Sequence, residues 1–83
     1  MMRAPSPLVP ALLSPRELQV LRFAAEGLNR EETAGRLGIT ANTVKAHRQA
    51  ILHKLGAHNM AGAVGIWARE TMVELLTGEG AQG

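Results

Sequence analysis

The sequence of 83 residues contains no cysteine, and its aromatic side chains are limited to one Phe and one Trp. The lack of cysteine excludes disulfides and thiolate metal sites, so the chain needs no oxidising compartment. The lack of aromatic side chains argues against a surface that stacks the bases of RNA or single-stranded DNA.

Long apolar runs are missing as well. No uninterrupted run approaches the roughly 20 residues of a transmembrane helix. Pro5, Pro7 and Pro10 interrupt the apolar core that a secretory signal peptide would require. We therefore expect a cytoplasmic protein that does not use a membrane as a partner.

Acidic residues are absent from the middle of the chain. No acid lies between Glu32 and Glu70, whereas five basic residues and all three histidines lie there. This asymmetry predicts a positive face on a body whose net charge is only +2. Such a face suits nucleic acid, although an ordinary solvated helix surface explains the charge spacing equally well.

The chain is long enough for one small domain, and its many Ala and Leu residues favour an all-α fold. We expect a Pro-rich flexible arm over 1–12, a folded domain over 13–77 and a disordered tail over 78–83. Start and stop signals predict a four-helix bundle containing a helix-turn-helix, with helices over about 15–26, 30–37, 41–55 and 60–76.

The helix starts carry strong local signals. Ser14 and Glu17 form a capping box around Pro15, Asn29 caps the second helix, and Thr40 caps the third. Leu18, Leu21 and Ala25 share the expected inner face of the first helix. Gly38 is expected to end the second helix in a left-handed conformation, and the short turn that follows forces the helices over 30–37 and 41–55 to cross steeply.

The helix over 41–55 has two different faces. Val44, Ile51 and Leu55 recur at helical spacing and predict the buried stripe. The opposite side carries polar and small residues and no acid: Asn42, Lys45, Ala46, Gln49 and, further along, Lys54. A helix anchored by one face and polar on the other suits insertion into a DNA groove.

The last predicted helix is apolar on two sides. Its small residues allow another backbone to approach closely, which makes it a candidate dimer contact. The alternative is a wide apolar stripe that covers a single core. We assign the predicted dimer interface to Ala61, Gly62, Gly65, Ile66 and Arg69.

Catalytic and metal sites are poorly supported. His47 lies near the inner stripe and is expected to be structural, and the spacing of His53 and His58 does not match a zinc site. Ser14 is a cap without the motif of a nucleophile. We predict no catalytic residue, no metal and no cofactor, and hence no enzyme.

Several motifs together resemble the C-terminal DNA-binding domain of LuxR/NarL-type transcriptional regulators. They run from about residue 13 to residue 70: Leu13-Ser14-Pro15-Arg16-Glu17, Val20-Leu21, Ala25-Glu26-Gly27, Ala34, Leu37-Gly38-Ile39-Thr40, Thr43-Val44-Lys45-x-His47 and Lys54-Leu55. The resemblance implies that the third helix enters the major groove and that the fourth supports dimerisation.

The resemblance also implies roles for individual residues. Lys45, Ala46 and Gln49 would face base edges, which agrees with their hydrogen-bonding and apolar chemistry. Asn42, Thr43 and Arg48 would lie nearer the phosphates, and Thr40 with the helix N-terminus would receive a phosphate. We include Lys54 in this predicted DNA-binding surface.

The expected function is sequence-specific binding of double-stranded DNA in transcriptional regulation, as a homodimer. A promoter-contacting region of a sigma factor is one alternative, and a helix-turn-helix interaction module that pairs with another regulator without binding DNA is the other. Glu31 supports the second alternative, because it places an acid where a cation would help phosphate binding. The chain has no Asp for a phosphoacceptor. We therefore expect the sensing or receiver domain to be on a longer parent chain, on a partner, or lost. RNA polymerase is a further candidate partner.

Overall fold

A computed structural model describes residues 8–76 of the chain, and all the regular structure in this range is helical. The helices are α1 (Leu8–Leu12), α2 (Pro15–Ala25), α3 (Arg30–Leu37), α4 (Ala41–Leu55) and α5 (Met60–Leu76). The all-α fold and the four predicted helices are confirmed, with α2 ending one residue earlier than expected. Of the helices between residues 8 and 76, none has the length and hydropathy to cross a membrane.

Helix α1 was not predicted. We expected a flexible arm up to Leu12, but Leu8–Leu12 is helical and Val9 is fully buried. The N–H of Val9 donates to Oε1 of Glu70 on α5 at 3.0 Å. Pro10 fits because it lies in the first turn, where its missing N–H removes no intrahelical bond. The rest of the predicted arm and the predicted tail lie outside the described residues.

One hydrophobic core joins all five helices. Val20, Leu21 and Ile51 are completely buried, and Leu18 and Phe23 are half-buried. Ala25 is exposed, so its predicted place in the core is wrong: α2 ends there and the chain turns away. The buried hydrophobic residues are Val9, Leu13, Val20, Leu21, Ala34, Val44, Ile51 and Ala63.

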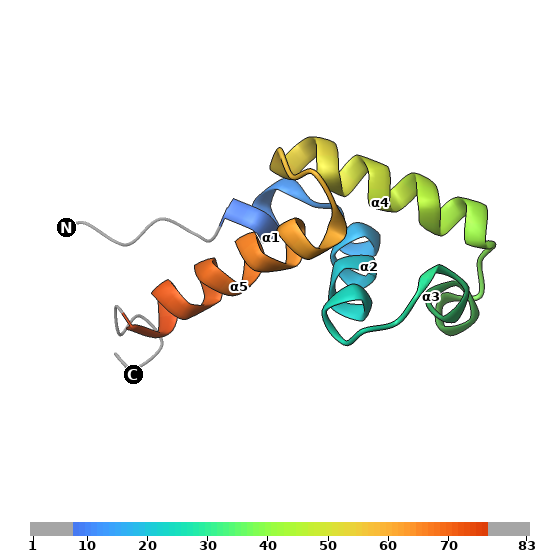
Figure 1. Ribbon diagram of the computed structural model, residues 1–83, viewed down its shortest axis with the longest axis horizontal. Helices are drawn as coiled ribbons and strands as arrows, with labels where there is room; N and C mark the ends of the chain where they lie inside the picture. Colours follow the sequence, from blue (N-terminus) through green and yellow to red (C-terminus); the bar gives the residue numbers. More distant parts are fainter. Residues whose placement is uncertain (1–7, 77–83) are drawn as a thin grey trace.

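The predicted caps form at the starts of α2 and α3. Ser14 and Glu17 bond reciprocally at the start of α2, and Asn29 and Glu32 do so at the start of α3. Gly38 ends α3 with a φ of 69°, a left-handed conformation that glycine adopts without strain. The short turn then sends α4 steeply across α3, as Figure 1 shows.

The far half of α5 extends beyond the other helices (Figure 1). Three large apolar side chains there are open to solvent: Met72 is 57%, Val73 57% and Leu76 77% exposed. The near half of α5 packs on α2 and α4 through buried Ala63 and half-buried Trp67. Helix α5 is therefore anchored at one end and unpacked at the other.

Candidate nucleic-acid interface

The outer face of α4 is assembled as its helical periodicity predicts. Val44 and Ile51 are fully buried and fasten α4 to the core. The side chains expected on the opposite side are all exposed: Asn42, Lys45, Ala46 and Gln49. We call these four residues the outer face of α4. Since α4 contains no acid, this face offers an ammonium, two amides and a methyl group without a nearby carboxylate of its own helix.

The first turn of α4 adds potential anion donors. The Thr40 hydroxyl accepts from the Thr43 N–H at 3.1 Å, and the two threonine hydroxyls lie 2.9 Å apart. The first N–H groups of any helix have no carbonyl partner one turn earlier, and the helix dipole favours an anion beside them. Because Thr40 and Thr43 are exposed, this end of α4 is open to a phosphate.

Arg48, predicted to lie nearer the phosphates, makes a hydrogen bond within the protein. It is half-buried, and its Nη2 donates to the Leu28 carbonyl at 3.1 Å, between α2 and α3. Its Nε is shielded from solvent and has no hydrogen-bond partner within residues 8–76. The guanidinium is thus directed toward the protein body.

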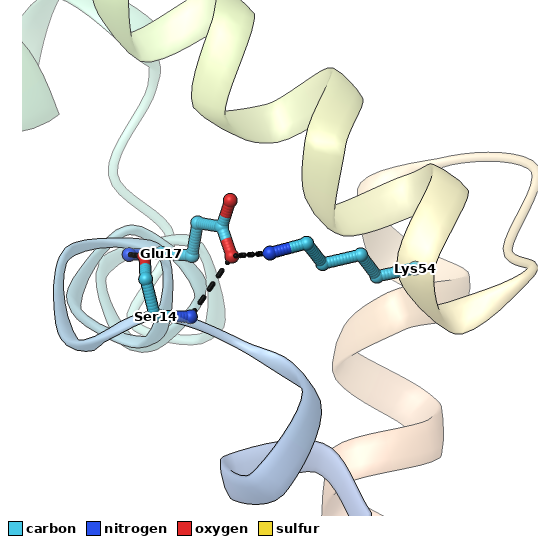
Figure 2. Close-up of polar contacts among 3 residues, drawn as sticks. All are labelled: Ser14, Glu17 and Lys54. Atoms are coloured by element: carbon cyan, nitrogen blue, oxygen red, sulfur yellow. Dashed lines mark hydrogen bonds and ion pairs between the residues drawn. The ribbon is translucent and has the colours of Figure 1, made fainter.

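Lys54 is exposed, but its ammonium is paired within the protein. Its Nζ bonds Oε1 of Glu17 at 2.7 Å, and the same oxygen accepts from the Ser14 N–H at 2.9 Å (Figure 2). Burial raises the pKa of Glu17, but the hydrogen bonds and charge of Lys54, together with the Ser14 bonds, outweigh it and hold this pKa below its ordinary value. The pair ties the end of α4 to the start of α2.

The histidines lie in separate environments. His47 is half-buried beside the inner stripe of α4, whereas His53 and His58 are exposed. No group of three potential metal-ligating side chains occurs in the part of the chain that the structure describes. The structural role predicted for His47 stays a prediction.

At the start of α3, Glu31 is exposed and lies 3.8 Å from the Arg30 guanidinium. This acid is the feature that favoured an interaction module over a DNA-binding one. An exposed ion pair of this length contributes little to stability, so the fold does not depend on it.

Of the α5 residues predicted for dimer contact, Ile66 packs against the core. Ala61, Gly62 and Arg69 are exposed, and Gly65 and Ile66 are half-buried. A Cβ added to Gly65 would come no closer than 3.8 Å to Arg69 Nη1, so space remains above this glycine. A shallow apolar groove runs beside this surface and is lined by Ala25, Val64, Trp67, Ala68, Thr71 and Met72.

Two residues that hold α4 in place were not predicted to contact it. Glu17 carried the signal of a capping residue, which concealed its second bond, to Lys54. Leu28 contributes through its backbone carbonyl, and a side-chain pattern gives no indication of such a contact. The acceptor of Arg48 therefore could not be found from residue types alone.

Comparison with known proteins agrees with this architecture. The family of bacterial regulatory proteins described as luxR (GerE) matches residues 11–66. The transcriptional activator RamA of Corynebacterium glutamicum is 46% identical over 52 residues, which are 63% of this chain and 18% of RamA. The C4-dicarboxylate transport transcriptional regulatory protein DctR of Rhodobacter capsulatus is 47% identical over 45 residues, 54% of this chain and 23% of DctR.

A nitrate/nitrite response regulator protein homolog of Haemophilus influenzae is 41% identical over 51 residues, 61% of this chain and 24% of that protein. The chain thus spans about a fifth of the length of the regulators that it matches. The family match covers more than half of the chain and includes α2, α3 and α4 in full. The chain therefore belongs to the luxR family of bacterial regulatory proteins, as its helix-turn-helix motifs predicted.

Proposed function

We propose that this domain binds double-stranded DNA sequence-specifically in transcriptional regulation, with α4 in the major groove. The observation that carries the proposal is the outer face of α4, which is exposed, free of acid and fastened from behind by buried Val44 and Ile51. A helix of this kind fits the major groove, where each base pair presents a distinct pattern of donors and acceptors. A cytoplasmic location belongs to the same proposal.

Within this surface, chemistry suggests a role for each side chain. Lys45 is suited to guanine O6 and N7, Gln49 to adenine N6 and N7, and the Ala46 methyl group to a thymine methyl group. Asn42 and Thr43, with Thr40 at the helix start, are suited to phosphate oxygens. We leave Lys54 out of this surface because its ammonium is paired with Glu17.

We further propose that two copies pair through α5 and read two half-sites. The support is the solvent side of α5, where Gly62 and Gly65 permit close approach and Met72, Val73 and Leu76 expose apolar surface. Burying this surface against a second copy would remove it from water. A sensing or receiver domain on a longer parent chain, and RNA polymerase, are the further partners we propose.

The decisive experiment is selection of bound sites from random duplexes, followed by affinity measurements on the selected site over a salt series. We expect the logarithm of affinity to fall linearly with the logarithm of salt concentration, with a slope of about −0.9 per phosphate neutralised. Lys45→Ala and Gln49→Ala should each cost about 1–3 kcal/mol and relax the preference at one base pair. Arg22→Ala removes an exposed charge from α2 and serves as the control.

Two outcomes would count against the proposal. Equal weakening of all sequences by both variants would show that Lys45 and Gln49 do not read bases. No binding at micromolar protein, or binding insensitive to salt, would favour the interaction module, for which exposed Glu31 is the specific observation.

A further inference from the structure

We infer that Arg48 is a positioning residue, which fixes the orientation of α4 against the α2–α3 connection and does not contact the DNA backbone. The inference rests on the proposed function, since it concerns how the reading helix is held. The inference gives Arg48 a different role from Lys45. Lys45, the other cation in the middle of α4, is exposed, whereas Arg48 is half-buried.

The acceptor of Arg48 is itself held firmly. Leu28 lies directly after Gly27, whose φ of 91° closes the end of α2. The Leu28 N–H donates to the Phe23 carbonyl at 3.0 Å, and the Gly27 N–H donates to the Ala24 carbonyl at 3.0 Å. These two bonds are the pattern that terminates a helix with a glycine. The backbone at Leu28 is therefore held against the end of α2.

The donor is fixed as well. Arg48 Nη2 lies 3.1 Å from the Leu28 oxygen, and Nε is closed off from solvent. Nη2 is engaged with the Leu28 carbonyl and Nε is turned away from solvent, so a phosphate contact through these two nitrogens would require the side chain to move. Bonds from a guanidinium to a neutral acceptor are charge-assisted and stronger than neutral ones, so leaving would lose a favourable contact.

The position of Arg48 along α4 links its bond to Leu28 with the orientation of Lys45 and Gln49. Arg48 directly precedes Gln49 and lies three residues after Lys45, so it shares a helical turn with both. Each residue along a helix turns about 100° around the axis. A bond from the flank of α4 to α2 therefore restricts rotation about the axis and sets the direction in which Lys45 and Gln49 point.

The test uses Arg48→Met, which keeps an apolar stem and removes the guanidinium, with Arg16→Met on the exposed side of α2 as the matched control. For a positioning role, we expect the preference for the selected site over random DNA to fall about tenfold, the loss expected of one charge-assisted bond. The slope of affinity against salt should stay at the wild-type value. A slope shallower by about 0.9 with site preference retained would identify a phosphate contact and overturn the inference.

A second measurement needs no DNA. Amide hydrogen exchange over residues 27–30 should be faster in Arg48→Met than in the wild type, with exchange around Ala63 unchanged, because the connection loses a partner only at Leu28. Unchanged exchange over residues 27–30 would overturn the inference whether or not the wild type binds DNA. A wild type that binds no duplex would instead refute the proposed function and leave this exchange result to decide the role of Arg48.

Discussion

Glu17 serves two helices with one carboxylate oxygen. Oε1 accepts from the Ser14 N–H, which completes the α2 cap, and from Lys54 Nζ at the end of α4. The residue is only 7% exposed, so the charge depends on these donors in place of water. Removing either donor leaves a carboxylate that has lost part of its solvation, and this loss is costly.

At pH 7, Glu17→Gln should lower the free energy of unfolding by about 1–2 kcal/mol, a value discounted because Lys54 is partly exposed. The folded-state pKa of Glu17 lies below its ordinary value of 4.5. Its stabilising effect is therefore complete above pH 4.5 and is lost as the pH falls through the folded-state pKa. Urea unfolding at pH 7 and pH 3 should show a difference between variant and wild type that shrinks at pH 3.

Glu26→Gln provides the control for this prediction, since it removes an exposed glutamate just after the same helix. It should change the free energy of unfolding by less than about 0.5 kcal/mol. A deficit of Glu17→Gln that is equally large at both pH values would show that the charge of Glu17 is not what stabilises the fold.

For single residues, the sequence predicted which side chains are exposed better than it predicted their hydrogen-bond partners. The exposure of Asn42, Lys45 and Gln49 follows from helical spacing, which sets the side of the helix on which each side chain projects. The partners of Arg48 and Lys54 do not follow from spacing. Long cationic side chains reach several neighbours from one backbone position, and their choice depends on elements far away in the sequence.

Among the elements, α2, α3 and α4 were predictable because local chemistry defines both of their ends. Each begins at a side chain that accepts a backbone N–H, and α3 and α4 end at left-handed glycines. Thr33 shows how such an element tolerates a polar residue in the core. It is fully buried, and its hydroxyl donates to the Asn29 carbonyl one turn earlier at 2.8 Å.

Helix α1 was missed for the opposite reason. Its five residues are too few for a periodic pattern, and Pro10 signals irregular structure. It is helical because tertiary contacts favour that state: Val9 is buried in the core and its N–H is bonded to Glu70. Isolated helices of this length are unstable in water, so its local sequence alone gave no basis for a prediction.

For α5, the proposed pairing makes a prediction at Gly65. Gly65→Leu should weaken self-association at least tenfold, because a larger side chain would hold the partner helix away from the small-residue surface. The folded monomer should tolerate the change, since the space above Gly65 is open. Analytical ultracentrifugation over a concentration series measures the association, and circular dichroism checks the fold.

Gly35→Leu on α3 is the matched control, because Gly35 is an exposed helical glycine and a Cβ added there would meet nothing within 4 Å. Both substitutions should stabilise the monomer by up to about 1 kcal/mol through helix propensity. If Gly65→Leu associates as the wild type does, α5 does not pair through this surface.

At the scale of the whole molecule, α1 closes the core on α4 and α5. A chain that starts at Leu13 would expose the surface that Val9 covers and would lose the Val9–Glu70 bond. Full burial of a valine contributes about 1.5–3 kcal/mol, so we expect the shortened chain to lose at least that much stability. Urea unfolding of the two chains measures the difference, and equal midpoints would contradict the contribution of α1.

This arrangement has a practical consequence for joining the domain to other proteins. The domain boundary expected from the sequence lies at Leu13, and the family match begins at residue 11, inside α1. Either boundary would cut through or discard α1. A fusion partner, affinity tag or protease site should therefore be placed before Leu8, so that Val9 keeps its place in the core.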